Sequence, residues 1–235
     1  MDLRDYFVFG KVNTLDYLMY AADKNQFEGG GKVSEIIKVP GRNGTLSIED
    51  GSFENINISY SMYCKGNILQ DIKAFRNRLS ATSGYCRLAD TFDPDVFMRA
   101  RYTEKFSVDS SDRKNAAFTV NFDCDPRRFL KSGEIPYVMT ASGGMFNPTR
   151  FAALPLLRIY GTGTITISRV SITITTADVY TDIDCEIQEA YKDSVNCNNN
   201  IVLTEGEFPT MPEGYNEITL SGISRVEITP RWWTI

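Results

Sequence analysis

The sequence of 235 residues contains no histidine. This absence removes the commonest general base near neutral pH, together with Ser-His-Asp and Cys-His nucleophile systems and every His-ligated metal site. Five cysteines are present, but no Cys-x-x-Cys pair occurs, and their spacings match no known zinc-ligand pattern. We therefore expect no metal, no cofactor and no catalytic residues, with most cysteines packing as free, small hydrophobic thiols.

The sequence also lacks long apolar runs and strongly basic segments. No apolar segment approaches the roughly 20 residues that span a bilayer, and residues 1–6 show no basic stretch leading into an apolar run, as a signal peptide would. A net charge of −5 makes it a poor candidate for holding a phosphate backbone. With 42% hydrophobic residues, the composition predicts a folded protein that does not enter a membrane and is assembled in a cytoplasm.

Alternation of apolar and polar residues with a period of two dominates the chain and predicts β-strands. The pattern is clearest in residues 56–62 and 118–124, and it recurs in residues 96–102, 165–167, 170–174 and 226–228. Turns are predicted at Asn43-Gly44 and at Glu49-Asp50-Gly51, because glycine takes a positive φ without steric cost. The fold class is therefore mainly β.

One helix is predicted, over residues 67–80. Asn67 can cap its N-terminus and Gln70 can complete a capping box. Apolar residues then recur at helical spacing, including Phe75 and Leu79, and Gly84 provides a stop. We expect the apolar face of this helix to pack on a sheet.

The alternation lapses between residues 131 and 155, where Ser142-Gly143-Gly144 and Asn147-Pro148 indicate turning chain. We therefore predict an N-terminal domain at residues 1–131, a linker at 132–150 and a C-terminal domain at 151–235. The first is expected to be β-sandwich-like with one helix. The second contains only strands and loops, which is typical of a β-sandwich.

Two acidic clusters have the composition of possible sites. The first comprises Asp90, Asp93 and Asp95 and could be a calcium site or a solvated acidic turn. The second comprises Asp182, Asp184, Glu186 and Glu189. It could supply a carboxylate pair for glycoside hydrolysis or form the polar face of an edge strand.

Aromatic and basic side chains offer two further candidate contacts. Neighbours in a strand point to opposite faces, so one of Trp232 and Trp233 can lie in the core while the other contacts a protein or a glycan. Because no other aromatic platform is evident, we predict that the C-terminal domain binds no glycan of its own. Arg127, Arg128 and Lys131 are too few for a nucleic-acid site and predict a solvated strand end or a salt-bridged joint.

Four stretches together resemble the distal tail protein family of long-tailed, siphovirus-type bacteriophages. They are residues 39–46 (VPGRNGTL), 90–100 (DTFDPDVFMRA), 122–134 (FDCDPRRFLKSGE) and a C-terminal signature at 183–186 (IDCE), 190–191 (AY), 208–209 (FP), 212–216 (PEGYN) and 230–233 (PRWW). None is specific alone. Their order and spacing over nearly the whole chain carry the resemblance.

The resemblance implies an N-terminal belt domain that forms a homohexameric ring and a C-terminal galectin-like β-sandwich. In such a ring, the protein joins the tail-tube protein to the tail-tip protein, often called the tail-associated lysin, within the tip or baseplate of the virion. The tape measure protein and receptor-binding proteins are further possible partners, and DNA passes the lumen without specific binding. Two alternatives stay open: a carbohydrate-binding module protein that aids host adsorption, and a carboxylate-dependent glycoside hydrolase.

Overall fold

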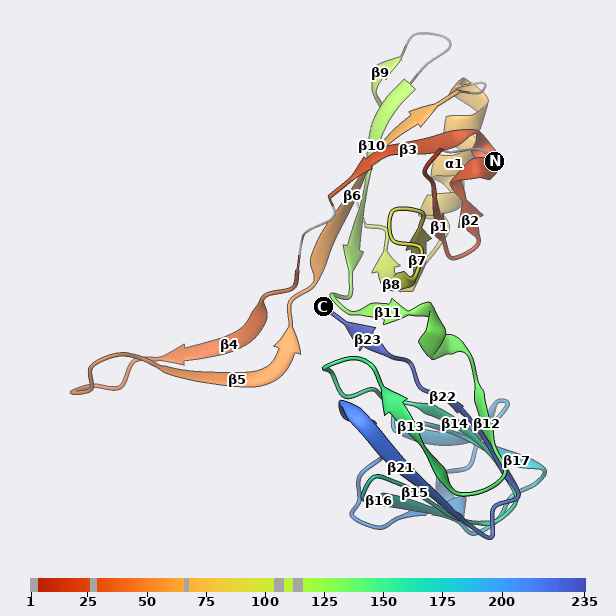
Figure 1. Cartoon of the computed structure of the whole chain (residues 1–235). Helices are drawn as coiled ribbons and strands as arrows, with labels where there is room; N and C mark the ends of the chain where they lie inside the picture. Colours follow the sequence, from red (N-terminus) through yellow and green to blue (C-terminus); the bar gives the residue numbers. More distant parts are fainter. Residues whose placement is uncertain (1–3, 26–28, 66–67, 104–107, 112–115) are drawn as a thin grey trace. The chain divides into compact units, whose positions relative to one another are not determined.

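The computed structural model describes residues 4–25, 29–65, 68–103, 108–111 and 116–235 (Figure 1). The chain divides into two compact units. The first extends to Arg128 and also includes Ile235, and the second is Phe129–Thr234. Each unit has its own cluster of buried apolar side chains, so each is described by itself.

The first unit contains most of the longer strands and the α-helix. Its elements are β1 (Phe7–Phe9), β2 (Val12–Asn13), η1 (Thr14–Tyr17), β3 (Met19–Lys24), β4 (Lys32–Ile37), β5 (Leu46–Phe53), β6 (Ile56–Cys64), α1 (Ile68–Ser80), β7 (Cys86–Asp90), β8 (Val96–Arg101), β9 (Val108–Ser111) and β10 (Ala116–Cys124). The main sheet has the order β2-β1-β7-β8-β10-β6-β3, and neighbouring strands in this order are antiparallel. The alternation in residues 56–62, 96–102 and 118–124 predicted these strands correctly.

This sheet folds over on itself to enclose a core of aromatic rings. β8 and β10 share only two registered residue pairs, at their ends, so the sheet turns sharply there. As a result, Phe7 on β1 faces strands from the other half of the sheet. Its ring centroid lies 4.7 Å from that of Tyr60 and 5.3 Å from that of Phe122. The first unit is therefore sandwich-like, as predicted.

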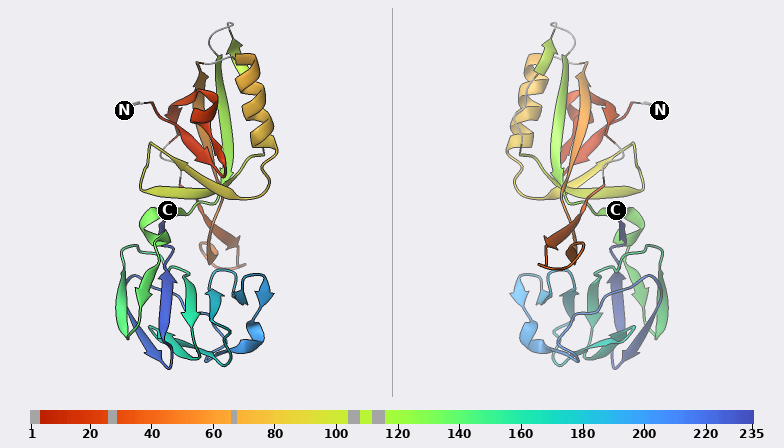
Figure 2. Two further views of the ribbon diagram at one scale, coloured as in Figure 1. Left: turned by 90° about the vertical axis from the view of Figure 1, so that its right-hand side faces the viewer. Right: turned by 90° about the vertical axis from the view of Figure 1, so that its left-hand side faces the viewer.

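Helix α1 packs on this core through one apolar face, which confirms the predicted helix. Phe75 and Leu79 are fully buried. The Phe75 ring centroid lies 6.3 Å from that of Phe118 on β10 and 5.5 Å from that of Tyr17. Figure 2 shows the helix, in gold, lying along β10. The predicted cap, Asn67, lies outside the described residues.

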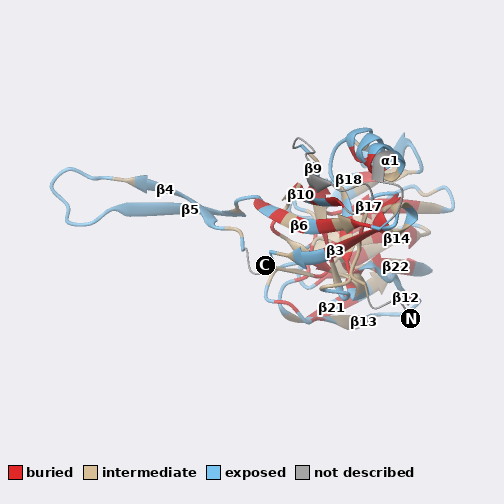
Figure 3. Cartoon of the chain, turned by 90° about the horizontal axis from the view of Figure 1, so that it is seen from above, coloured by how far each residue is buried: buried red, intermediate tan, exposed pale blue. Residues whose placement is uncertain are grey.

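Strands β4 and β5 form a separate two-stranded hairpin. Almost all of its residues are exposed, and Figure 3 shows the ribbon in pale blue. The chain reverses between the two strands, around the predicted turn at Asn43-Gly44, where Gly44 has a φ of +84°. The turn predicted at Glu49-Asp50-Gly51 was wrong, because these residues lie inside β5. Gly51 has a φ of +82° where the register with β4 shifts, so the glycine serves an irregularity in the strand.

The second unit contains two antiparallel sheets. Its elements are β11 (Arg128–Leu130), η2 (Lys131–Glu134), β12 (Tyr137–Met139), β13 (Gly143–Asn147), β14 (Leu156–Tyr160), β15 (Gly163–Ile167), β16 (Val170–Ile174), β17 (Tyr180–Asp184), β18 (Glu189–Lys192), β19 (Val195–Asn196), η3 (Asn198–Asn200), β20 (Ile201–Leu203), β21 (Gly214–Ser221), β22 (Arg225–Thr229) and β23 (Trp233–Thr234). The sheet orders are β12-β22-β14-β17-β18-β19 and β13-β21-β15-β16-β20, and β11 pairs with β23. Their inward-facing residues, largely isoleucines, form one shared core, so the unit is a β-sandwich.

Residues 132–150, predicted to be a linker, are instead part of this sandwich. Strand β12 pairs with β22, and β13 pairs with β21. These edge strands are only three and five residues long, too short to show the apolar alternation from which strands are predicted. The boundary between the units falls at Arg128 and Phe129. Among the described residues, none of the helices has both the length and the apolar character needed to cross a membrane.

Candidate functional site

The first acidic cluster is organised around one buried carboxylate. Asp90 accepts hydrogen bonds from Lys24 Nζ at 2.7 Å, from Tyr60 Oη at 2.6 Å and from the backbone N–H groups two and three residues further on. Burial, and then the Asp90 charge, raise the pKa of Tyr60. Asp93 and Asp95 are exposed on the turn that follows. Asp90 therefore fixes this turn to the sheet, and its oxygens are already occupied.

Two aspartates of the second acidic cluster are paired with arginines from distant parts of the chain. Asp182 accepts hydrogen bonds from Arg158 at 2.7 and 2.8 Å, and Asp184 accepts two from Arg231 at 2.7 and 2.9 Å. Both aspartates lie on β17, which runs between β14 and β18. The prediction of an edge strand was therefore wrong. Two-point pairing with guanidinium groups explains how both carboxylates can be buried.

The protonation of Asp184 follows from this pairing. Burial raises its pKa, but the hydrogen bonds and charge of Arg231 outweigh that effect, so the pKa of Asp184 lies below its usual value. A carboxyl group with a lowered pKa is a poor general acid, because it holds no proton near neutral pH. Among the described residues, no group of three or more Cys, Asp or Glu side chains is placed to hold a metal ion.

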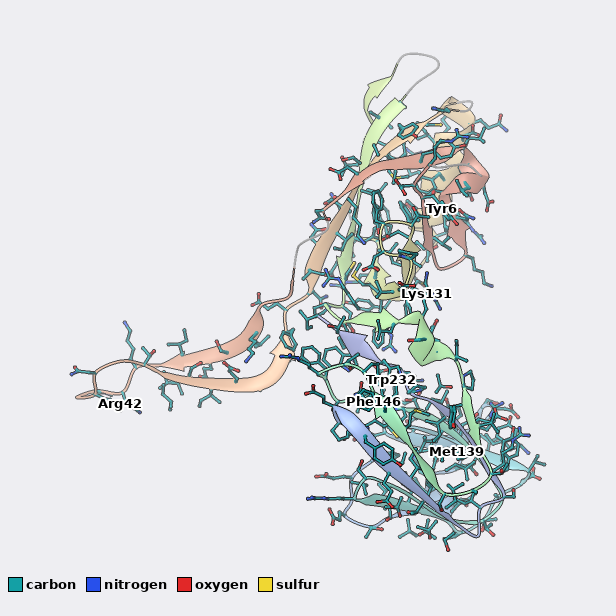
Figure 4. All side chains as sticks on the ribbon, in the orientation of Figure 1. Tyr6, Arg42, Lys131, Met139, Phe146 and Trp232 are labelled. Atoms are coloured by element: carbon teal, nitrogen blue, oxygen red, sulfur yellow. The ribbon has the colours of Figure 1, made fainter. Side chains whose placement is uncertain are left out.

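The two tryptophans have different environments, neither of them an open platform. Trp232, which is labelled in Figure 4, is only 6% exposed and belongs to the sandwich core. Gly133 packs so closely against its backbone that a side chain at position 133 would overlap the Trp232 nitrogen. Trp233 is half-buried, stacks on Phe151 with a centroid distance of 4.3 Å, and donates its indole N–H to Ala152 O at 3.0 Å. Both rings are held by their own unit.

The basic cluster includes a salt bridge within the first unit. Arg127 donates from Nε to Asp125 at 3.0 and 3.1 Å and from its terminal nitrogen at 2.5 Å. Burial raises the pKa of Asp125, but Arg127 more than offsets this, so the pKa is lowered. The positive charge of Arg127 is therefore paired with the negative charge of Asp125, two residues earlier in the chain.

The β4–β5 hairpin presents an apolar face that the sequence analysis did not identify. Its register places Glu35 opposite Ile48 and Ile37 opposite Leu46, so alternate positions share one face. Ile37, Leu46 and Ile48 therefore line the same side, together with Glu35, and Ile48 is 49% exposed. The opposite side carries Ile36 among serines and charged residues. The apolar residues are visible in the sequence, but the sequence alone did not show that this face stays exposed among the described residues of the unit.

An open pocket of about 460 Å³ lies beside β17, β18 and β19 in the second unit. The charged side chains that line it are already paired. Lys192 bonds to Asp178 at 2.5 Å, and the Tyr180 hydroxyl donates to Asp193 at 2.8 Å. The pocket therefore offers a potential ligand few unoccupied polar groups among these lining residues.

Together, these observations describe a protein of two β-sandwich units with arginine-paired carboxylates and an exposed apolar hairpin. No family model and no curated protein matches the chain. Its structure is similar to the crystal structure of the SPP1 Dit (gp 19.1) protein, described as a paradigm of the hub adsorption apparatus in phages that infect Gram-positive bacteria. The TM-score is 0.72 at 13% sequence identity, covering 98% of this chain and 99% of that chain. The mainly β fold implied by the distal tail resemblance is therefore confirmed over nearly the whole chain.

Proposed function

We propose that this protein is a structural component of the tail of a long-tailed bacteriophage. In this proposal, six copies form a ring at the distal end of the tail tube and act as the assembly hub of the virion tip. The ring joins the tail-tube protein to the tail-tip protein, and DNA passes through its lumen. The fold shared with a phage hub protein over both units supports this role, and the sequence resemblance supplies the number six.

The observation that carries the proposal is the β4–β5 hairpin. A two-stranded hairpin alone is marginally stable in water, so an exposed one calls for a surface to pack on. Here the hairpin forms a sheet of its own, and the apolar face that contains Leu46 and Ile48 is exposed. Single exposed apolar residues are ordinary, but an apolar stripe along a two-stranded ribbon is typical of a contact surface.

We propose that a second copy of this chain covers the hairpin. A closed ring requires a heterologous interface, in which one patch meets a different patch on the neighbouring copy. The β4–β5 hairpin, which forms a two-stranded sheet and has an exposed apolar face, can provide one of these two patches. The accepting half then belongs to the remainder of the neighbour's first unit, and the contact repeats around the ring.

Two neighbouring residues on opposite faces of the hairpin provide the test. Ile48→Lys places a charge on the apolar face, whereas Ser47→Lys places the same charge on the opposite face, one residue away. Native mass spectrometry, with negative-stain images at high protein concentration, measures assembly of each variant. We expect rings for wild type and Ser47→Lys, and monomers for Ile48→Lys, because the substitution replaces apolar contact area with an ammonium group that loses its water at the interface, even with Glu35 opposite it.

Rings of isolated protein can be weak, so the same three proteins are also mixed with purified tail tubes. Wild-type protein that stays monomeric and also fails to join tail tubes overturns the proposed function. Rings of Ile48→Lys as abundant as those of wild type leave the ring intact but overturn the role of the hairpin. The arginine-paired carboxylates offer no support for the alternative of a glycoside hydrolase.

A further inference from the structure

Two aromatic side chains lie next to each other on the outer face of the sandwich. Phe146 on β13 and Tyr215 on β21 are directly opposite in the antiparallel register. Phe146 is 65% exposed and Tyr215 is 70% exposed. Figure 4 labels Phe146 on the sheet that contains both strands. Cross-strand partners on one face have close Cβ atoms, so both aromatic side chains stand on the same exposed face of the sheet.

Gly144 leaves room for the Tyr215 ring to lie against the backbone of β13. The outer end of the phenol, including its hydroxyl, occupies the space where a Cβ at position 144 would stand. Gly144 lies two residues before Phe146 and opposite Glu217, so the ring crosses diagonally over β13. Only glycine leaves this space free. The phenol is thus supported from below by backbone while most of its surface stays exposed.

The rest of this sheet face is polar and rich in hydroxyl groups. Thr166 and Ser171 pair through their hydroxyls at 2.7 Å, and Thr164 and Thr173 pair at 2.9 Å. Glu217 follows Tyr215 on the same face of β21. In the five strands of this sheet, the strongly exposed large apolar side chains are Phe146, Tyr215 and, on β20, Val202.

The β15–β16 turn adds polar groups next to the aromatic pair. The backbone N–H of Ser168 donates to Glu217 O at 2.8 Å, which places the turn residues Ser168 and Arg169 beside β21. Both turn residues are exposed. A ligand lying over the two rings would therefore meet the Glu217 carboxylate and the turn at the margin, where the Ser168 hydroxyl donates to Asn216 Oδ1 at 3.0 Å and keeps its accepting lone pairs.

We propose that the surface formed by Phe146, Tyr215 and Glu217 binds a neutral polysaccharide. The C–H groups on one face of a sugar ring pack well against the electron-rich face of an aromatic ring, while sugar hydroxyls bond to surrounding polar groups. A protein partner would instead require a wider apolar centre than two rings within a hydroxyl-lined sheet. A strongly anionic polymer would be repelled by the Glu217 carboxylate at the margin of the surface.

This proposal reverses the prediction that the second unit binds no glycan. That prediction rested on the lack of an aromatic platform besides Trp232 and Trp233. The structure places those two rings in the core or against Phe151 and brings Phe146 and Tyr215 together instead. The inference does not depend on the ring proposed above, because all of these residues belong to one unit of one chain.

Affinity electrophoresis of the full chain tests the proposal. Native gels contain soluble glucan, mannan, galactan or rhamnan as neutral probes, and poly(glycerol phosphate) as an anionic probe. We expect at least one neutral polymer to retard the wild-type protein. Tyr215→Ala and Phe146→Ala should each weaken that binding by about tenfold, and Tyr215→Phe, which keeps the ring, should retain it.

Gly144→Ala tests the position of the Tyr215 ring. Both aromatic rings remain in this variant, while the added methyl group displaces the phenol. We expect the same loss of retardation as for Tyr215→Ala. Tyr137→Ala is the matched control, since Tyr137 is an exposed tyrosine on the other sheet and its loss should change nothing. Thermal melting by circular dichroism verifies that each variant is folded.

Three results would overturn the proposal. The first is a wild-type protein that no neutral polymer retards. The second is retardation only by the anionic probe. The third is retardation that persists unchanged in Tyr215→Ala and Phe146→Ala. Because the readout uses the protein without tail tubes, failure here is distinct from failure of ring assembly.

Discussion

Replacing Phe75 with alanine tests how helix α1 is attached to the first unit. The ring is fully buried, and its centroid lies within 6.3 Å of the centroids of Phe7 and Phe118 and 5.5 Å from that of Tyr17. Truncating a fully buried phenylalanine removes its transfer free energy and leaves a cavity, at a cost of about 3–5 kcal/mol. The site is lined by large rings on three elements, so it can collapse little. We therefore expect a loss towards the upper part of that range.

Urea unfolding measures this loss of stability. Circular dichroism monitors the unfolding, together with a second probe that separates the transitions of the two units. Only the transition of the first unit should move to lower urea. Lys73→Ala is the matched control, because Lys73 lies on the exposed side of the same helix and its truncation should change stability by no more than about 0.5 kcal/mol. A loss under about 1 kcal/mol for Phe75→Ala would show that the helix does not pack as described.

Three further outcomes are expected. Iodoacetamide at pH 8 should label the half-exposed thiols of Cys86 and Cys197 in the native protein but leave Cys124 unreacted, because burial raises the pKa of Cys124 to about 12; labelling of Cys124 as fast as Cys197 contradicts this. Asp184 has a lowered pKa, so its contribution to stability is full above the unfolded pKa of about 3.9 and is lost as pH falls through the lower folded value. Arg231→Met should therefore destabilise the second unit by about 3 kcal/mol at pH 7 in urea titrations, with a smaller loss in acid, whereas a loss independent of pH points to packing alone. The first unit, residues 1–128, has 18 Lys and Arg against 18 Asp and Glu, so a ring whose lumen it lines has no net positive charge and should not hold duplex DNA at about 0.15 M salt; tight, salt-sensitive binding in a gel-shift assay would refute this.

The local pattern of the sequence determined much of the fold. Strands β6 and β10 and helix α1 follow from period-two alternation and from helical spacing, because in each case one face is buried and the other is exposed. The mainly β class and the presence of two units followed from the same signal. The absence of histidine is equally plain in the sequence, and it removes several catalytic mechanisms by composition alone.

Where a strand lacks the contrast between a buried and an exposed face, the local pattern gave wrong predictions. The short edge strands β12 and β13 were predicted to be a linker, although they complete the two sheets of the sandwich. Gly51 was predicted to lie in a turn, although it accommodates an irregularity within β5. In both cases, hydrogen bonds to a distant strand set the conformation, and such bonds leave no mark on neighbouring residues.

The character of each candidate site was decided by tertiary structure alone. Sequence identified the carboxylates of Asp182 and Asp184, but their arginine partners lie 24 and 47 residues away, and pairing turns a possible catalytic pair into a structural one. In the same way, residues on β13 and β21 become neighbours only when the sheet forms, which creates the aromatic surface of Phe146 and Tyr215. Periodicity records which side of a strand is buried, whereas strand order and register decide which side chains meet.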